Sequence, residues 1–293
     1  MSKRTNNRHR VATICRRATG LPHHICHRWA GEGLITRTQP VPDAARAAQR
    51  AFEAHVVLVL ADRLRHEQAG GALLGFTRAE PTSEGLVLTV HPAMADRVVS
   101  ELLPRLDTRY GGLRGVPGLR LVGGPGRWSL SGLVDDTCIR LVHPDPTWMP
   151  TLPGDQADTA YVWRRSPRRP EGIETESPHA SWGEARDWLI SRLLRRSSLV
   201  NEAGAAHGWA NTYTHGSRGV VIEWCCAMGS AQMAERLVRS GLTAVPPGWT
   251  GDQDPEAGNW TRYGKLQLGE ALVTVRQAPC AEQPMRALRG GVR

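Results

Sequence analysis

The sequence predicts an α+β protein, in which a small N-terminal helical module of the helix-turn-helix type precedes two tandem, duplicated α-β-β-α-β-β domains with antiparallel sheets. The duplication rests on two similar segments, Gly-Leu-Val-Leu-Thr-Val at 85–90 and Gly-Val-Val-Ile-Glu-Trp at 219–224. Every even-numbered residue in both is apolar, which is typical of a strand with one buried and one partly wet face. Around both segments the expected elements follow in the same order, 134 positions apart as far as the hairpin, and the next helix matches after a five-residue insertion.

The first domain opens with a helix expected over 44–65, with Asp43 suited to its N-cap. Its middle, Phe52–Leu60, is apolar nearly all round, which predicts burial on more than one side. His55 within this run is interpreted as a core histidine, because no other ligand lies at metal-binding spacing. Further strands are expected at 72–77, 85–90, 119–122, 128–134 and 137–143, with a helix from Pro92.

The second domain repeats this order, with helices at 182–196 and 231–240 and strands at 203–213, 219–225, 260–268 and 271–276. Between the domains, residues 144–180 hold seven of the twenty prolines, and only 159–163 resemble a strand. We therefore interpret this stretch as a linker with a mobile loop around 166–179. The predicted boundaries are 1–40 for the N-terminal module, 43–145 and 181–280 for the repeats, 146–180 for the linker and 281–293 for a basic tail.

The net charge of +9 is concentrated at one end of the chain. Residues 1–50 contain ten Lys or Arg against Glu32 and Asp43, which is typical of a polyanion-binding segment, although a solubilising arm is the alternative. Only Lys3 and Lys265 are lysines, so the arginine excess also reflects an actinobacterial-like coding bias.

Six cysteines without framework spacing indicate reduced thiols in a cytoplasmic protein. No apolar run is long enough for a membrane span, and no apolar segment follows the basic N-terminus as in a secretory signal.

The N-terminal module is expected to form two short helices, at 11–18 and 23–30, separated by Thr19-Gly20. Glycine tolerates the left-handed conformation that ends a helix, and Pro22 suits the first turn of the next one. Residues 34–36 are expected to form a short strand or wing. Helix, tight turn and helix is the layout of a helix-turn-helix.

The segment Ala18-Thr19-Gly20-Leu21-Pro22, followed by Trp29 and by Glu32-Gly33-Leu34-Ile35, resembles the DNA-binding motif of MerR-type regulators. In that family a Thr-Gly-Leu/Val-Ser turn precedes a recognition helix that ends in an aromatic residue and is followed by Glu-Gly-Leu. The family's Arg-x-Tyr wing is missing, and Thr36–Pro40 stands in its place. The resemblance covers about a tenth of the chain and implies DNA binding. Similar Ala-Thr-Gly-Leu-Pro segments also open actinobacterial proteins, a likeness that implies no DNA binding.

The helix-turn-helix interpretation gives each polar residue of the module a role. Side chains of the second helix face the major groove and basic side chains around it meet phosphates, while Ile25, Trp29 and Leu34 form a small core. The alternative is a helical hairpin docked on the body or on another protein. The expected DNA-binding residues are His23, His24, His27 and Arg28 for the bases, and Arg8, Arg10, Arg16, Arg17 and Arg37 for the phosphates.

No metal or cofactor is expected. A zinc site would need His23 and His27 together with Cys15 and Cys26, and histidines on the polar face of a recognition helix explain the cluster more simply. The glycine-rich segment 123–126 lacks the lysine and the following helix of a phosphate-binding loop.

In the second repeat, a ligand or partner surface is hypothesised around His207, Trp209, His215, Glu223 and Cys225. The thiol is interpreted as a buried structural cysteine. No catalytic constellation stands out, so an enzyme, which would gather histidines and the acids of 252–256, is the third hypothesis.

The sequence thus favours a DNA-binding transcription regulator whose duplicated body senses a ligand or binds a partner. Such proteins usually dimerise to match two half-sites, so a homodimer is expected. The alternative is a non-enzymatic adaptor whose N-terminal segment docks on a protein partner.

Overall fold

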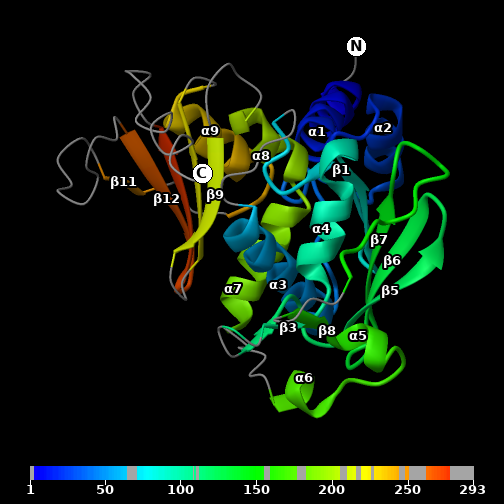
Figure 1. The fold of residues 1–293 in the computed structure, drawn as a ribbon. Helices are drawn as coiled ribbons and strands as arrows, with labels where there is room; N and C mark the ends of the chain where they lie inside the picture. Colours follow the sequence, from blue (N-terminus) through cyan, green and yellow to red (C-terminus); the bar gives the residue numbers. More distant parts are fainter. Residues whose placement is uncertain are drawn as a thin grey trace.

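The computed structural model describes residues 3–64, 71–107, 109, 112–154, 159–176, 183–204, 210–215, 219–225, 228–243, 248–250 and 262–277. Two five-stranded sheets stand on either side of a layer of helices, and the N-terminal helices lie across one end of that layer (Figure 1). This arrangement confirms the α+β class. No helix in the described ranges is long and apolar enough to cross a membrane.

The two repeats share one order of main elements, which is a long helix, a hairpin, a second helix and three further strands, and the second repeat has one additional helix, α8. The first consists of α3 (Ala47–Arg63), β1 (Phe76–Pro81), β2 (Leu86–Val90), the 3-10 turn η1 (Pro92–Met94), α4 (Ala95–Leu102), β5 (Leu119–Gly124), β6 (Arg127–Gly132) and β7 (Thr137–Val142). The second consists of α7 (Glu184–Leu194), α8 (Ser197–Gly204), β9 (Ala210–His215), β10 (Gly219–Trp224), α9 (Ser230–Arg239), β11 (Gly248–Thr250), β12 (Arg262–Leu268) and β13 (Ala271–Gln277).

The topology of the two sheets is identical. Their strand orders, β1-β2-β7-β6-β5 and β9-β10-β13-β12-β11, match strand for strand. The register matches as well, because Leu86 lies opposite Ile139 in the first sheet and Val220 lies opposite Val273 in the second. Both members of the second pair lie 134 positions after those of the first, so the spacing seen in the sequence holds in space.

The sheets differ from the antiparallel ones expected, because their central pairs, β2 with β7 and β10 with β13, are parallel. A helix and two antiparallel strands of the same sheet separate the partners in the chain, and the first repeat adds two short strands after α4. The last strand of each repeat therefore runs in the same direction as the second. The hairpin and the remaining pairs are antiparallel.

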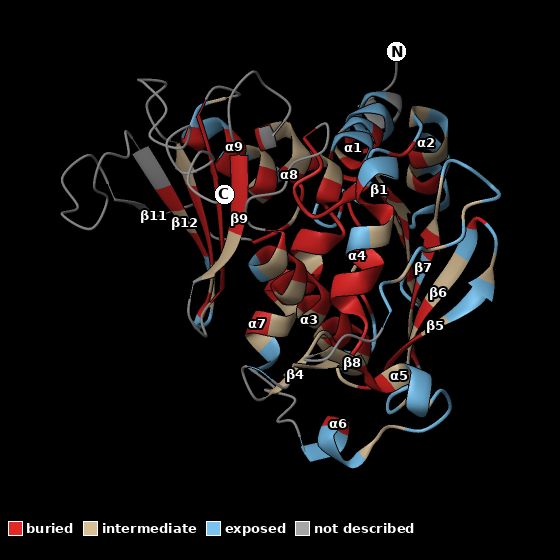
Figure 2. Cartoon of the chain, in the orientation of Figure 1, coloured by how far each residue is buried: buried red, intermediate tan, exposed pale blue. Residues whose placement is uncertain are grey.

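The two central strands differ in burial. Along β2 buried and half-buried residues alternate, which confirms one core face and one partly wet face. All six residues of β10 are buried, so the partly wet face expected for the second copy is wrong (Figure 2). Its glutamate, Glu223, is accommodated by hydrogen bonds from Asn211 Nδ2 and Tyr213 Oη, both at 3.1 Å.

Helices α3 and α7 form the interface between the repeats. Helix α3 contacts β7 of one sheet and β9 of the other, which confirms its burial on more than one side. Inside this interface Glu53 accepts hydrogen bonds from Arg195 Nη2 at 2.7 Å and Nε at 2.8 Å, and both side chains are fully buried. Ser191 Oγ donates a further bond of 2.6 Å to the same carboxylate.

Asp43 is not the N-cap expected for the first long helix, which begins at Ala47 without a side-chain cap. The carboxylate instead accepts hydrogen bonds from the guanidinium of Arg192, the shortest 2.6 Å, and from Trp188 Nε1. Burial opposes its charge, but Arg192 outweighs that effect and holds the pKa of Asp43 below its usual value. Asp43 therefore ties the start of the first repeat to α7 of the second.

The proline-rich stretch 146–180 differs from the mobile linker expected. Its described part forms β8 (Thr159–Tyr161), α5 (Val162–Arg165) and α6 (Gly172–Glu176), and β8 pairs with β3 (Arg105–Asp107), which in turn pairs with β4 (Gly112–Arg114). Glu174 is buried and binds Arg120 of β5 at 2.8 Å. Similarly, 203–204 end helix α8 rather than opening the expected strand.

Acidification is expected to release α6 from the first sheet. Burial would raise the pKa of Glu174, but Arg120 and the N–H groups of Glu171 and Gly118 outweigh it and lower that pKa. A lowered pKa means that the stabilisation is complete above the ordinary glutamate value of about 4.3 and is lost as the pH falls through the folded-state value. Hydrogen-exchange protection of residues 172–176, corrected for intrinsic rates, should therefore decline below about pH 4, and the Glu174→Gln variant should lack it already at pH 7. Unchanged protection in the variant at pH 7 would contradict this role.

Candidate nucleic-acid interface and arginine pocket

The N-terminal module consists of α1 (Lys3–Thr19) and α2 (His23–Glu32), joined by a three-residue turn. Gly20 opens the turn with φ of 76°, a conformation that favours glycine. Thr19 Oγ1 accepts the N–H of Leu21 at 3.2 Å, and Gly33, with φ of 78°, ends α2 in a left-handed C-cap. The glycine turn between the two helices therefore confirms the one predicted from the sequence, and α2 ends at Gly33.

A small core, separate from the main one, holds the two helices together. Trp29 belongs to it as expected and Ile25 borders it, but Leu34 is 59% exposed and Ile35 occupies the interior instead. The expected strand or wing at 34–36 is absent, and Thr36 N–H donates to Gln39 O in a turn. The buried members of this core are Val11, Ala12, Cys15, Leu21, Cys26, Trp29 and Ile35.

The module is docked on the body through α1, and α2 packs mainly on α1 (Figure 1). Ala18 is part of the main core, and a Cβ added at Gly20 would lie 3.2 Å from Thr77 O of β1 and from Ser198 Oγ of α8. The outer face of α2 remains open. The geometry therefore combines the docked hairpin and the exposed second helix, which the sequence left as alternatives.

The expected DNA-binding residues divide into two groups around α1. His24, His27 and Arg28 are exposed on α2, and Arg8 and Arg16 are exposed on α1. His23 is half-buried, and its ring centroid lies 4.8 Å from that of His9 and 6.0 Å from that of His27. The second group, Arg10, Arg17 and Arg37, lines a pocket between α1 and the body.

The histidine cluster does not gather metal ligands. Cys15 and Cys26 are buried in the small core, and the described residues include no group of three or more side chains placed to hold a metal ion. Partial burial, His9 and His27 lower the pKa of His23, which favours the neutral form of its ring.

The pocket between α1 and the second repeat, here termed the arginine pocket, has a volume of about 980 Å³. Asn6, Arg10, Thr13 and Arg17 project into it from one face of α1, at i, i+4, i+7 and i+11. The facing wall comes from α7, α8, α9 and the turn at 36–39. Its six arginines are Arg10, Arg17, Arg37, Arg192, Arg236 and Arg239, and no carboxylate is among its described lining residues.

Three carboxylates that do not line the pocket neutralise part of the positive charge of its arginines. Glu202 binds Arg17 Nε at 2.7 Å and also Arg236, while Asp43 binds Arg192 and Glu235 binds Arg239. Arg10 and Arg37 have no ion-pair partner within the described part of the chain. Six arginines and three carboxylates leave a surplus of three positive charges around the pocket.

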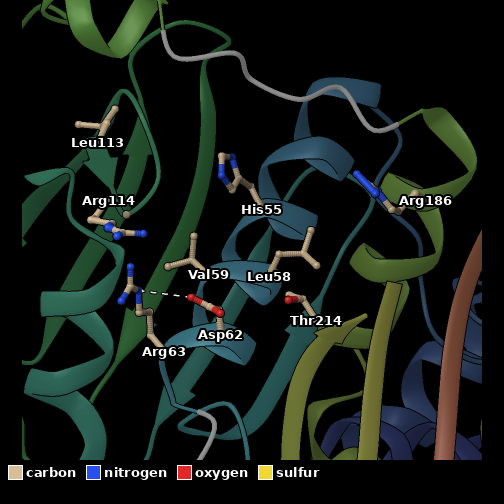
Figure 3. Close-up of a pocket in the computed structure, with 10 residues that line it drawn as sticks. His55, Leu58, Val59, Asp62, Arg63, Leu113, Arg114, Arg186 and Thr214 are labelled. Atoms are coloured by element: carbon tan, nitrogen blue, oxygen red, sulfur yellow. Dashed lines mark ion pairs between the residues drawn. The ribbon is translucent and has the colours of Figure 1, made fainter. Parts of the chain in front are cut away.

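A second, smaller pocket of about 270 Å³ lies between the repeats (Figure 3). His55 lines it and is half-buried, which differs from the core histidine expected. Arg63, Arg114 and Arg186 also line it; Asp62 lies 3.5 Å from Arg63, and burial lowers the pKa of Arg186 to about 10. The three guanidinium groups make the pocket basic, and its described lining has no serine or cysteine nucleophile.

The expected ligand or partner surface in the second repeat is not assembled by the described residues. Glu223 and Cys225 are buried, the latter as expected for a structural cysteine. His215 ends β9 opposite Gly219, and His207 and Trp209 lie outside the described residues, as do the acids of 252–256.

Sequence reasoning missed Arg192, Arg236 and Arg239 as site residues. They lie about 180 to 230 positions after Arg10, and only the packing of α1 on the second repeat brings them to it. No protein-family model matches the chain, and no curated protein or solved structure is significantly similar to it.

Proposed function

We propose that this chain is a DNA-binding regulatory protein in which α2 reads the major groove. The observation that carries the proposal is the open outer face of α2, where His24, His27 and Arg28 are exposed although α1 is anchored in the body. An α-helix fits the major groove, and an arginine can pair bidentately with a guanine there. Arg28 is 64% exposed, and its only acidic contact among the described residues is Glu32 at 4.0 Å.

Arg8 and Arg16 support this role as phosphate contacts. Both are exposed on α1 and lie close to α2. Arg8 Nη1 would lie 3.9 Å from a Cβ added to Gly31 of α2, and the positive charge of Arg16 contributes to the lowered pKa of His23. Phosphate contacts fix the position of a protein on the duplex rather than its sequence preference. Because readers of this kind usually bind two half-sites, we propose that the protein acts as a homodimer.

The Arg28→Ala variant is expected to weaken binding to a selected duplex by about 1–3 kcal/mol, the usual contribution of a bidentate base contact. Fluorescence anisotropy of the full chain, measured over a salt series against selected and random duplexes, provides the test. Arg165→Ala is the matched control, because Arg165 is an exposed arginine of α5, at the far end of the molecule from α2 (Figure 1). Equal affinities of both variants, or no DNA binding by the wild type at low salt, would refute the proposal.

A protein-binding role is the second candidate, favoured by the exposure of Leu34 beside the end of α2. An apolar side chain at this place suits a protein contact better than a phosphate backbone. Leu34→Ser would then abolish a stoichiometric protein complex that carries no nucleic-acid absorbance, and it would leave DNA affinity intact if the first proposal holds.

A further inference from the structure

We propose that the arginine pocket binds a small phosphate-bearing ligand with an apolar body. Its volume of about 980 Å³ lies at the upper end of ordinary ligand sites. A DNA duplex is too wide to enter such a concavity. Single-strand channels carry aromatic side chains on which bases stack, whereas His9 is the only ring among the described lining residues.

The arginines are arranged to receive an oxyanion. Arg192 and Arg236 are each 20% exposed and are held by Asp43 and Glu202, so their guanidinium groups are already positioned. Arginine presents several N–H donors in a planar fork that matches phosphate oxygens. Arg10 and Arg37, without ion-pair partners among the described residues, supply charge that a ligand can neutralise.

A buried cation behind the pocket wall is an independent reason to expect that the pocket binds an anion. Arg196 is fully buried and donates to Ser240 O, Ser240 Oγ and Arg192 O, yet within the described residues no carboxylate lies at ion-pair distance from it. Its Nη2 would lie 3.4 Å from a Cβ added to Gly241, which lines the pocket. Burial lowers its pKa to about 9, so it remains charged at neutral pH. A bound anion would compensate this charge through a thin wall.

The apolar residues that line the pocket indicate what the part of the ligand beyond the phosphate is like. Ile14 of α1 and Val238 of α9, both half-buried, contribute apolar surface between the arginines. A bare inorganic anion would leave this surface in water, whereas an organic phosphate would cover it. The ligand class is therefore an organic phosphate, such as a nucleotide.

This site does not depend on DNA binding, because no residue of α2 is among the described residues that line the pocket. The probe is ATP labelled with a fluorescent N-methylanthraniloyl group, titrated into the full-length protein near 0.1 M salt, with inorganic tripolyphosphate as competitor. We expect saturable binding, roughly tenfold or more weakened in Arg10→Ala and in Arg37→Ala, since each variant removes a charged hydrogen-bond donor without exposing a carboxylate. Arg165→Ala and Arg28→Ala should bind the probe like the wild type.

Three results would overturn the proposal. They are the absence of saturable binding up to millimolar probe, equal weakening by Arg165→Ala, and binding of tripolyphosphate as tight as that of the labelled nucleotide. The last would mean that the apolar wall takes no part. Circular dichroism of each variant confirms that its fold is retained. Failure of the DNA proposal would appear only in the duplex-binding assays, so the two outcomes are separable.

Discussion

Gly219→Ala is expected to destabilise the second repeat by about 3 kcal/mol or more, as overpacking does where the neighbouring atoms cannot move. A Cβ at this position would lie 1.6 Å from Leu272 O, a backbone atom of β13, the parallel partner of β10. Relief of this contact would require the two central strands of the sheet to separate. The glycine is needed for close approach, and not for a left-handed conformation, since its φ is not positive.

The duplication supplies the control for this experiment. Gly85 precedes β2 at the position equivalent to Gly219, and a Cβ added there would meet nothing within 4 Å. Urea denaturation should therefore show a large fall in the midpoint for Gly219→Ala and a change within about 0.5 kcal/mol for Gly85→Ala. Similar midpoints for the two variants would mean that the β10–β13 pairing is looser than described.

Glu53→Gln is expected to lower the free energy of unfolding by about 3–5 kcal/mol, the usual result of removing one partner from a buried ion pair. The amide would keep the shape of the side chain but leave the guanidinium of Arg195 uncompensated. Both side chains are fully buried at the α3–α7 interface, so water cannot replace the lost charge. Chemical denaturation should show the loss as a lower midpoint at an unchanged slope.

An exposed pair is the matched control for the buried one. Glu235 binds Arg239 at 2.5 Å with both side chains more than half exposed, and Glu235→Gln should change stability by no more than about 1 kcal/mol. The double variant Glu53→Leu with Arg195→Met should recover most of the stability, because apolar replacements for a buried pair are often neutral. Arg195 Nη1 also donates to Pro42 O and Thr82 O, and a Glu53→Gln variant as stable as the wild type would show that these backbone acceptors satisfy the guanidinium alone.

Much of the fold could be predicted because its signals are local. The alternation in β2, the glycine turn at Gly20 and the C-cap at Gly33 each lie within a few residues of the structure they specify. The spacing of 134 residues between similar segments also allowed the order of elements in the second repeat to be predicted from that in the first. The parallel central pairs required the path of the whole repeat, and alternation within one strand carries no such information.

The partners of charged side chains could not be predicted in this way. Asp43 has the spacing of an N-cap, and its actual partner, Arg192, lies 149 positions later. The arginine pocket likewise draws α1 together with α9, so its two walls are distant in sequence. Helical periodicity indicates which residues share a face, but it cannot specify what that face packs against.

The buried ion pair between Glu53 and Arg195 is not symmetric with respect to the two repeats. By the spacing of 134 residues, Asp187 stands in the second repeat where Glu53 stands in the first, but the position equivalent to Arg195 is Ala61. The two repeats therefore share a topology, but they contribute different residues to the interface between them. Glu53 comes from the first repeat and Arg195 from the second. Two identical first halves would bury Glu53 without a guanidinium, and two second halves would bury Arg195 without its carboxylate. If the halves were expressed as separate chains, this asymmetry would select the heterodimer over either homodimer.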